Sequence, residues 1–319
     1  MKLLMIGGTK FVGRAYVDEA LKRGHDVTLF TRGKTNPDVF PEAEHLVGDR
    51  ESDLSALEGR MWDAVIDTCG YEPDVVRRSA SLLNTAVGHY TFVSSISVYA
   101  DRLTAAVDES SRIKAPGEAA DDDGGYGWRK AECERVVREA FDDRALILRP
   151  GLIVGPHEDV GRLPFWLHCA ASWARVIAPA PADRTIQLID ARDIAAGGLG
   201  LIETHVGGVL NVTAPEGEQT FRDLVADCLD VTGSDADVAW VDDATLERAG
   251  IEMWTELPLW APMSMPGTWA ADVTRAQEAG FVSRQLRDTV DDTWRWFRDE
   301  NDYRPRFPWL TQARAASLS

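Results

Sequence analysis

Short apolar runs alternate with helical patterns through the first half of the chain. The run Leu3 to Ile6 is followed by a helical pattern from Val12 to Arg23 and then by a second apolar run, Val27 to Phe30. Both runs are apolar at consecutive positions, which is typical of strands that are buried on both faces of a sheet. The pattern therefore predicts a strand, a helix and a parallel strand in succession.

The same alternation continues toward the middle of the chain. Further strands are expected at Asp63–Asp67, Tyr90–Ser94 and Ala145–Arg149, and helices are expected at Asp74–Val87 and from Tyr126 onward. This alternation predicts an α/β fold, in which a doubly wound parallel sheet of the Rossmann type is covered by helices on both faces.

The pattern changes after Pro150, where the sequence becomes irregular and rich in Pro and Trp. A strand-then-helix pattern returns at Thr185–Leu199, and a strand is expected at Gly208–Val212. A smaller C-terminal substrate lobe is therefore expected to be interleaved with the Rossmann domain. The expected division assigns residues 1–155 and 186–214 to the Rossmann domain, and residues 156–185 and 215–319 to the substrate lobe. Most of the tryptophans lie in the second half and either fill a small core or form a substrate wall.

The chain is strongly acidic, with a formal net charge of -18 at pH 7 and a pI near 4.7. Such a surface repels phosphate backbones, so no nucleic acid is expected as the main partner. The acid excess and the preference for Arg over Lys suit a salt-rich cytoplasm, but they equally suit a GC-rich genome. A small-molecule substrate is favoured.

The sequence contains no apolar run long enough to span a membrane, and its N-terminus does not resemble a cleaved signal peptide. A cytoplasmic protein without membrane contact is expected. The cysteines, which lie far apart and form no metal-ligand spacing, are Cys69, Cys133, Cys169 and Cys228. Neither disulfides nor a metal site are expected.

The first expected strand passes directly into the first helix through a glycine turn. The turn consists of Gly7, Gly8, Thr9, Lys10, Phe11, Val12 and Gly13. Glycines allow backbone N–H groups to approach a pyrophosphate at the N-terminus of the helix. The turn therefore predicts a dinucleotide-binding loop, in which the ammonium of Lys10 can approach a cofactor phosphate.

The end of the second expected strand bears on the choice of cofactor. A carboxylate there would bind the adenosine ribose of NAD and repel the 2′-phosphate of NADP. This chain has Thr31 at that place, followed by Arg32 and Lys34. NADP is therefore expected to be preferred over NAD, unless the two cations are only solvated loop residues.

Candidate catalytic residues lie in two stretches near the middle of the chain. The expected strand Tyr90–Ser94 closes with the stretch Ser94-Ser95-Ile96-Ser97-Val98-Tyr99, and a later helix begins with Tyr126-Gly127-Trp128-Arg129-Lys130. Residues i and i+4 share a helix face, so the Tyr126 phenol and the Lys130 ammonium can point into one cleft. A neighbouring cation favours the phenolate, which brings Tyr126 toward the working range of a general acid/base.

Together these stretches resemble the motifs of extended short-chain dehydrogenases/reductases, in the NAD(P)-dependent epimerase/dehydratase family. The glycine turn is similar to GxxGxxG with Lys10 in place of the middle glycine. The serine stretch is similar to SSxxVYG with Ala100 in place of the last glycine, and the helix start is similar to YxxxK. The resemblance covers roughly residues 1–215, including the stretches Leu148–Pro156 and Ile189–Ala195.

The resemblance implies a role for each of these residues. Tyr126 would move the proton, Ser95 would orient the reacting oxygen with Ser97 as the alternative, and Lys130 would hold the nicotinamide ribose. Cofactor contacts are implied for Gly7, Thr9, Lys10, Phe11, Val12, Gly13, Thr31, Arg32, Lys34, Asp49, Ser94, Lys130, Pro150 and Leu152. Substrate contacts are implied for Ser97, His157, Arg162 and Trp166, although His157 can also be an ordinary loop residue.

The implied function is hydride transfer between NADP or NAD and a carbinol or carbonyl carbon of a small polar substrate, for which a nucleotide sugar is one candidate. The sequence leaves open whether the enzyme is an epimerase or a reductase of a non-sugar carbonyl. The rival hypothesis is a non-catalytic module that senses dinucleotides or binds RNA, because the glycine turn also resembles proteins of the chloroplast stem-loop-binding type. The complete set of catalytic residues and the acidic charge disfavour this rival.

The resemblance also implies a homodimer that buries the helix from Tyr126 to Phe141 in a four-helix bundle. Val136, Val137 and Phe141 form an apolar stripe on that helix, although the same residues must also face the sheet.

Overall fold

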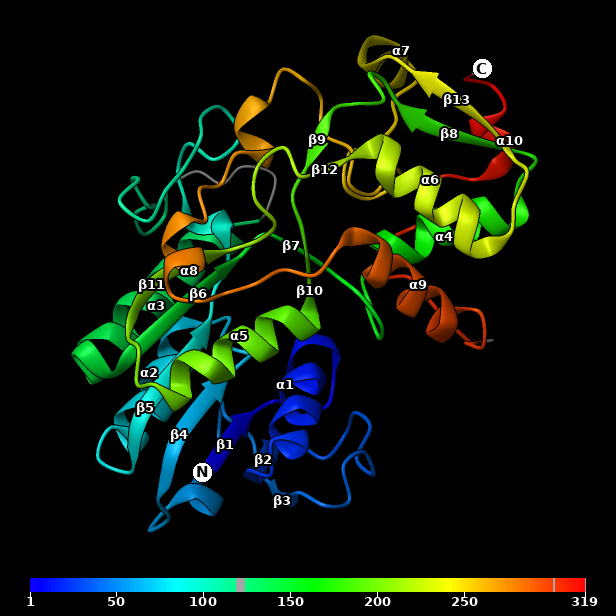
Figure 1. The fold of residues 1–319 in the computed structure, drawn as a ribbon. Helices are drawn as coiled ribbons and strands as arrows, with labels where there is room; N and C mark the ends of the chain where they lie inside the picture. Colours follow the sequence, from blue (N-terminus) through cyan, green and yellow to red (C-terminus); the bar gives the residue numbers. More distant parts are fainter. Residues whose placement is uncertain (119–123, 301, 319) are drawn as a thin grey trace.

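The computed structural model describes residues 1–118, 124–300 and 302–318. The largest element in these ranges is a seven-stranded sheet in which every pair of neighbouring strands is parallel. Its strands are β1 (Lys2–Ile6), β2 (Asp26–Thr31), β3 (Glu44–Val47), β4 (Trp62–Asp67), β5 (Val87–Val93), β6 (Ala145–Pro150) and β11 (Gly208–Val212). They lie side by side in the order β11-β6-β5-β4-β1-β2-β3 (Figure 1). The direction of winding reverses between β1 and β4, which places a crevice at the carboxyl ends of these two strands.

Helices cover both faces of this sheet (Figure 1). Two of them pack together on one face and two on the other: α1 (Phe11–Lys22) with α5 (Ala191–Glu203), and α2 (Pro73–Leu83) with α3 (Tyr126–Phe141). Successive side chains of β1 pack on opposite faces of the sheet. Leu3 and Met5 pack toward α1, while Leu4 and Ile6 pack on the other face. The doubly wound parallel sheet expected from the apolar runs is therefore confirmed. In the described ranges, no helix is both long and apolar enough to cross a membrane.

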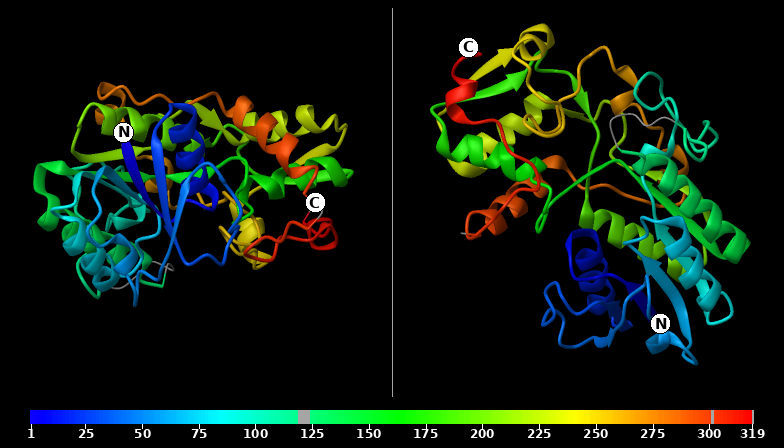
Figure 2. Two further views of the ribbon diagram at one scale, coloured as in Figure 1. Left: turned by 90° about the horizontal axis from the view of Figure 1, so that it is seen from below. Right: turned by 180° about the vertical axis from the view of Figure 1, so that it is seen from behind.

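The second lobe contains smaller sheets and its own apolar core. The elements beyond the large sheet and the helices that cover it include β7 (Leu152–Val154), α4 (Arg162–Ser172), β8 (Arg175–Pro179), β9 (Thr185–Ile186), β10 (Leu188–Asp190), β12 (Gln219–Thr220), α6 (Phe221–Thr232), β13 (Asp237–Val241), α7 (Asp243–Arg248), α9 (Leu286–Phe297) and α10 (Gln312–Ala315). Helix α6 packs against both α4 and α9, while β8 pairs in parallel with β13. The N-terminus and α10 lie at opposite ends of the molecule (Figure 2).

The chain returns from the second lobe to cover the outer edge of the large sheet at β11. Helix α8 (Thr274–Glu278) packs against β11, and Ala276 and Phe281 join the core between the sheet and α1. The N–H of Asn211 in β11 donates to a Glu109 carboxylate oxygen at 2.7 Å, and its side-chain amide donates to the Asp272 carbonyl at 3.0 Å. The expected domain division remains a prediction, but Ala276 and Phe281 pack with the first core although that division places them in the second lobe.

The apolar stripe that is expected at a dimer interface is buried inside the protein. Val136, Val137 and Phe141 are at most 2% exposed and pack between α3 and the sheet. The outward face of α3 carries Arg135 and Glu139, which form an ion pair. The expectation that the stripe is available to a second copy is therefore wrong, because the helix has one apolar face and the sheet occupies it. The homodimer itself remains a prediction.

Candidate active site

A cavity of about 450 Å³ lies at the carboxyl ends of β1, β2 and β4. It is formed by the glycine turn, by the loops after β2 and β3, and by the loop between β4 and α2. Its lining includes most of the residues for which the sequence predicts cofactor contact, namely Gly7, Thr9, Lys10, Phe11, Val12, Gly13, Thr31, Arg32, Lys34 and Asp49. The fold thus gathers the predicted residues of the glycine turn and of the loops after β2 and β3 around one space.

The glycine turn leaves the N-terminus of α1 open toward this cavity. A Cβ on Gly13 would lie 2.8 Å from the Gly8 nitrogen, so only glycine allows this close approach of backbone. The amide of Asn36 donates to the Thr9 carbonyl at 2.9 Å and ties the turn to the loop after β2. Lys10 precedes α1, and among the described residues its side chain makes no capping hydrogen bond to the helix. The first N–H groups of α1 can therefore receive an anion.

The loops after β2 and β3 carry charges of both signs into the lining of the cavity. The side chains of Arg32 and Lys34 are exposed and line it, while Thr31 accepts a backbone N–H from its own loop at 3.2 Å. Asp49 is half-buried on the loop after β3, and one of its carboxylate oxygens accepts the N–H of Glu51 at 2.9 Å. The expected phosphate-binding cations Arg32 and Lys34 thus lie in the same cavity as Asp49, for which a cofactor contact is expected.

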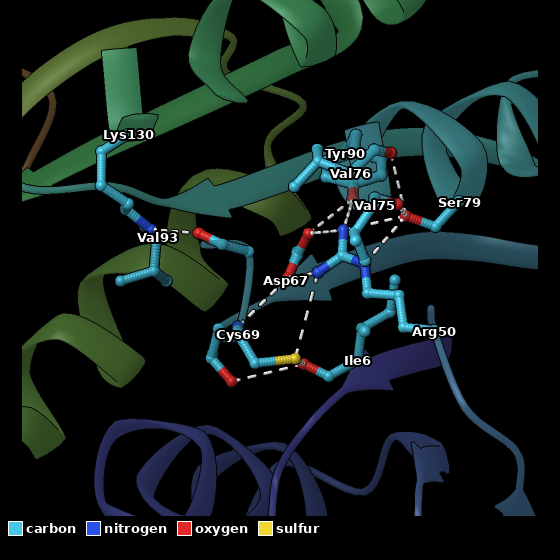
Figure 3. A network of polar contacts seen from close by, with 12 residues as sticks. Ile6, Arg50, Asp67, Cys69, Val75, Val76, Ser79, Tyr90, Val93 and Lys130 are labelled. Atoms are coloured by element: carbon cyan, nitrogen blue, oxygen red, sulfur yellow. Dashed lines mark hydrogen bonds and ion pairs between the residues drawn. The ribbon is translucent and has the colours of Figure 1, made fainter. Parts of the chain in front are cut away.

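Arg50, which lines the cavity, forms a buried ion pair with Asp67 at the end of β4 (Figure 3). Arg50 Nη1 donates to Asp67 Oδ1 at 2.8 Å, and its Nη2 donates to Ser79 Oγ at 2.8 Å. The hydroxyl of Tyr90 donates to Asp67 Oδ2 at 2.8 Å. Burial alone would lower the pKa of Arg50, but the Asp67 carboxylate raises it above its ordinary value, so the guanidinium stays charged. The network joins the loop after β3 to β4, β5 and α2.

Cys69 also lines the cavity, at the loop that follows β4. Its thiol lies 3.4 Å from the Ile6 carbonyl, to which it donates. Burial raises the pKa of this thiol to about 11, and the Asp67 charge adds to the effect. At pH 7 the group is therefore a neutral thiol and a poor nucleophile.

Lys130 is held by backbone carbonyls from two different strand ends. Its side chain is buried, and its Nζ donates to the Gly70 carbonyl at 2.9 Å and to the Val93 carbonyl at 2.7 Å (Figure 3). The ammonium also lies 4.3 Å from the centroid of the Phe92 ring. Burial lowers the pKa of Lys130 to about 8, while Asp67 acts in the opposite direction. Two of the three donors of the ammonium are thus occupied by carbonyls.

Tyr126 lies one helical turn before Lys130, at the start of α3. Its ring centroid is 6.5 Å from that of Tyr71, and the ammonium of Lys130 is 5.4 Å from the Tyr71 ring centroid. Tyr71 in turn lines the cavity. In the described part of the chain, Ser95, Tyr126 and Lys130 do not themselves line the cavity, but Tyr71 places the Tyr126 helix directly beside it.

The three serines of the predicted motif have different surroundings. Ser95 is half-buried, and its Oγ accepts the N–H of Ser97 at 3.1 Å in the short turn after β5. Ser97 is half-buried as well. Ser94 is 3% exposed, and its hydroxyl donates to Glu134 Oε1 at 2.5 Å. The side chain of Ser94 therefore faces the interior, whereas the O–H of Ser95 remains available as a donor within the described residues, and a contact of Ser94 with the cofactor remains a prediction.

Glu134 lies on the same face of α3 as Lys130, one turn further on, and it neutralises Arg149 at the end of β6. Arg149 donates to the Glu134 carboxylate from Nε at 3.0 Å and from Nη2 at 2.6 Å. Arg149 Nη1 also donates to the Tyr99 hydroxyl at 2.9 Å, which donates to Asn211 at 2.7 Å. This network fixes α3 against the sheet. The spacing of Tyr126, Lys130 and Glu134 along one helix face is a signal from which Glu134 could have been predicted.

Some predicted contact residues are buried away from the cavity. Trp166 is 1% exposed in the core of the second lobe, and its Nε1 donates to the Pro258 carbonyl at 3.0 Å. The prediction that it contacts substrate is wrong, because the core covers the whole side chain. Pro150 is buried at the end of β6, and Leu152 packs against the second core. Neither lines the cavity among the described residues.

The other two predicted substrate residues lie near the start of α4. The ring centroids of His157 and Trp296 lie 5.2 Å apart in an edge-to-face arrangement. Burial lowers the pKa of His157 to about 4, and the Arg14 charge acts in the same direction. Its imidazole is therefore neutral at pH 7. Arg162 begins α4, where its Nη1 lies 3.7 Å from the carboxylate of Glu158. Both residues contact the second lobe, and their roles toward a substrate remain predictions.

The second lobe contributes two charged residues to the cavity, Asp159 and Arg306. Sequence reasoning missed both of them. Asp159 follows β7 and Arg306 belongs to the C-terminal segment, so no local spacing connects either of them with the glycine turn.

The sequence profile of the NAD dependent epimerase/dehydratase family matches residues 3–213. Among curated proteins, the chloroplast stem-loop binding protein of 41 kDa b from Arabidopsis thaliana is 27% identical over 256 residues, which cover 73% of this chain and 63% of that protein. The chain thus spans less than two thirds of the length of this relative.

Solved structures of nucleotide-sugar epimerases have the same fold. A UDP-N-acetylglucosamine 4-epimerase from Methanobrevibacter ruminantium M1, in complex with UDP-N-acetylmuramic acid, has a TM-score of 0.69 and 17% identity, with 94% of this chain and 98% of that chain covered. A UDP-glucuronic acid 4-epimerase from Bacillus cereus, in complex with NAD, has a TM-score of 0.66 and 15% identity, with 93% and 99% covered. At these identities the likeness establishes the fold.

Proposed function

Because the chain belongs to the NAD dependent epimerase/dehydratase family, we propose that it binds NADP or NAD in the cavity and transfers hydride to or from a carbinol or carbonyl carbon. The substrate is a small polar molecule, for which a nucleotide sugar is the leading candidate. The observation that carries the proposal is the cavity itself, which joins the glycine turn to the end of β2 and adjoins the helix of Tyr126 through Tyr71.

The residues that line the cavity fit a dinucleotide. The open N-terminus of α1, which Gly13 allows to lie close to Gly8, would hold the diphosphate. Arg32 and Lys34 would hold a 2′-phosphate, and Asp49 would accept a hydrogen bond from the adenine amine. These cations, and the absence of an acid at Thr31, support NADP as the preferred form. The solved UDP-glucuronic acid 4-epimerase is a complex with NAD, so both forms must be compared by experiment.

NAD(P) would supply the hydride acceptor and donor, and the protein would supply the proton and the orientation. In the proposed reaction, Tyr126 takes the proton from the substrate hydroxyl, or returns it to the carbonyl oxygen. Lys130 would favour the phenolate of Tyr126 by its charge, and its remaining donor would hold the cofactor ribose. Ser95 donates to the reacting oxygen, since its Oγ is fixed by the Ser97 N–H.

The test is a substrate screen with NADPH and NADH, followed by nicotinamide absorbance and extended to nucleotide sugars by product chromatography. A reductase would consume the reduced cofactor, whereas an epimerase would convert a nucleotide sugar without net consumption. If the protein binds a dinucleotide but converts no substrate in either format, a sensing module replaces the enzyme as the better proposal.

The second candidate function is binding of stem-loop RNA. It is supported by the likeness to the Arabidopsis protein, whose name describes stem-loop binding. The net charge of -18 opposes it, because an acidic surface repels a phosphate backbone. A gel shift at near-physiological salt, run beside a dinucleotide titration, separates the two functions. We expect the dinucleotide to bind and the RNA to remain unshifted.

A further inference from the structure

Asp159 holds two cations from distant parts of the chain in the lining of the cavity. Its Oδ2 lies 3.4 Å from Lys10 Nζ and 3.0 Å from Arg306 Nη2. Lys10 belongs to the glycine turn, and all three residues line the same space. One carboxylate of the second lobe therefore gathers an ammonium and a guanidinium beside the open N-terminus of α1.

The C-terminal segment that carries Arg306 is fixed on both sides of this residue. The Tyr303 hydroxyl donates to the Glu158 carbonyl at 2.9 Å, and Trp309 Nε1 donates to the Gly161 carbonyl at 3.1 Å. The rings of Tyr303 and Trp309 stack with their centroids 6.0 Å apart. Both anchors hold the segment to the loop that contains Asp159, so the fold itself determines where Arg306 lies.

The cluster of Lys10, Arg306 and Asp159 has a net positive charge, which favours the binding of a second anion. Lys10 and Arg306 together carry two positive charges against the one negative charge of Asp159, and the N-terminus of α1 adds a partial positive charge. A dinucleotide that binds the glycine turn brings a diphosphate to this N-terminus. A guanidinium binds phosphate oxygens through two parallel N–H groups and forms the stronger contact with the more highly charged anion.

We propose that Arg306 is a ligand of the cofactor diphosphate, and that Asp159 is its counter-ion in the free protein. The diphosphate then replaces Asp159 as the main partner of Arg306 and Lys10. The inference rests on the proposed function, because it requires the cavity to bind a dinucleotide. It gives the second lobe a direct contact with the cofactor.

A structural role for the same ion pair makes a different prediction. If Asp159 only holds the C-terminal segment in place, loss of either partner weakens dinucleotide binding. If Asp159 competes with the diphosphate, Arg306→Gln weakens binding while Asp159→Asn leaves it unchanged or tightens it. Only under the proposal does Arg306→Gln weaken binding while Asp159→Asn does not.

The experiment is isothermal titration of the full-length protein with NAD, NADP and ADP-ribose. We expect the dissociation constants of the Arg306→Gln protein to rise about tenfold, as for the loss of one charge-assisted hydrogen bond. The rise should be the same for ADP-ribose as for the dinucleotides, because all three carry the diphosphate. Arg304→Gln is the matched control: Arg304 belongs to the same segment, its side chain is 78% exposed, and it pairs with Asp302.

Equal binding by the Arg306→Gln, Arg304→Gln and unsubstituted proteins would overturn the proposal. Weaker binding by the Asp159→Asn protein would also overturn it and would assign the ion pair to structure. A loss confined to NAD and NADP, with ADP-ribose unaffected, would place Arg306 at the nicotinamide half. Failure of the unsubstituted protein to bind any of the three ligands would instead reject the proposed function. Thermal unfolding of each variant shows whether the protein is folded in the titration.

Discussion

The ammonium of Lys130 donates a 2.7 Å hydrogen bond to the carbonyl of Val93, the last residue of β5. The bond joins the helix that begins at Tyr126 to the strand that leads into Ser95. A buried ammonium therefore sets the relative positions of the proposed acid/base and of the serine that would face it.

Tyr126→Phe should lower kcat/KM by about 10² to 10⁴ on a confirmed substrate, with little change in dinucleotide affinity. The substitution removes the hydroxyl that moves the proton but keeps the ring beside Tyr71. Steady-state kinetics and a dinucleotide titration on the same preparation check both parts. Full activity would show that the tyrosine assignment is wrong.

Lys130→Met should damage both turnover and dinucleotide binding, unlike the change at Tyr126. The ammonium is assigned to the phenol and to the ribose, and its loss leaves the carbonyls of Gly70 and Val93 without their donor. The comparison needs kcat/KM and dissociation constants for both variants. Unchanged cofactor affinity in the Lys130→Met protein would remove the ribose contact from the proposal.

Arg32→Ala should narrow the gap between the affinities for NADP and NAD, because it removes a cation from the end of the cavity where a 2′-phosphate would lie. Lys22→Ala, in the last turn of α1, is a control of similar charge change outside that lining. Titration of both cofactors with each variant measures the gap. Tighter binding of NAD than of NADP by the unsubstituted protein would contradict the expected preference.

Glu134→Gln should lower the free energy of unfolding by about 3–5 kcal/mol, since it leaves the buried Arg149 without its counter-charge. Glu139→Gln, on the same helix, is the matched control. Its side chain is 53% exposed and pairs with the exposed Arg135 and Arg77, so a change below about 1 kcal/mol is expected. Urea unfolding gives both values. Equal losses of unfolding free energy in the Glu134→Gln and Glu139→Gln proteins would mean that burial of the Glu134–Arg149 pair does not increase its contribution to stability.

Glu158 should make stability depend on pH. It is fully buried, and burial raises its pKa to about 7 although Arg162 opposes the shift. The ordinary pKa of this carboxyl is 4.5, so between pH 4.5 and pH 7 the unfolded chain binds fewer protons than the folded protein. Stability is then present at low pH and falls across that window by up to about 3 kcal/mol. Unfolding curves of the unsubstituted and Glu158→Gln proteins should diverge across this window, and parallel curves would exclude a buried titrating carboxyl.

The large sheet and the glycine turn could be predicted because their signals are local. Consecutive apolar residues such as Leu3 to Ile6 show a strand buried on both faces, and the spacing of Tyr126 and Lys130 shows a shared helix face. Two ion pairs could not be predicted in this way, because only the tertiary fold brings their partners together: Arg50 with Asp67, and Lys10 with Asp159.

The errors have a common physical cause. An apolar side chain on a helix shows that one face is buried, but the sequence does not say what buries it. Trp166 was expected to face a substrate, and Val136 was expected to face a second copy, yet the protein's own cores cover both.

The way the chain returns to β11 determines what a C-terminal deletion would do. A strand edge with unpaired N–H and C=O groups is a template for pairing with other chains. Residues around Asp272 and helix α8 pack against that strand here: the Asn211 side-chain amide donates to the Asp272 carbonyl, while the Asn211 N–H donates to Glu109. A protein shortened to end before them would uncover one side of β11 together with the apolar surface under Phe281. Aggregation, and not simply lost turnover, is the expected first effect of such a deletion.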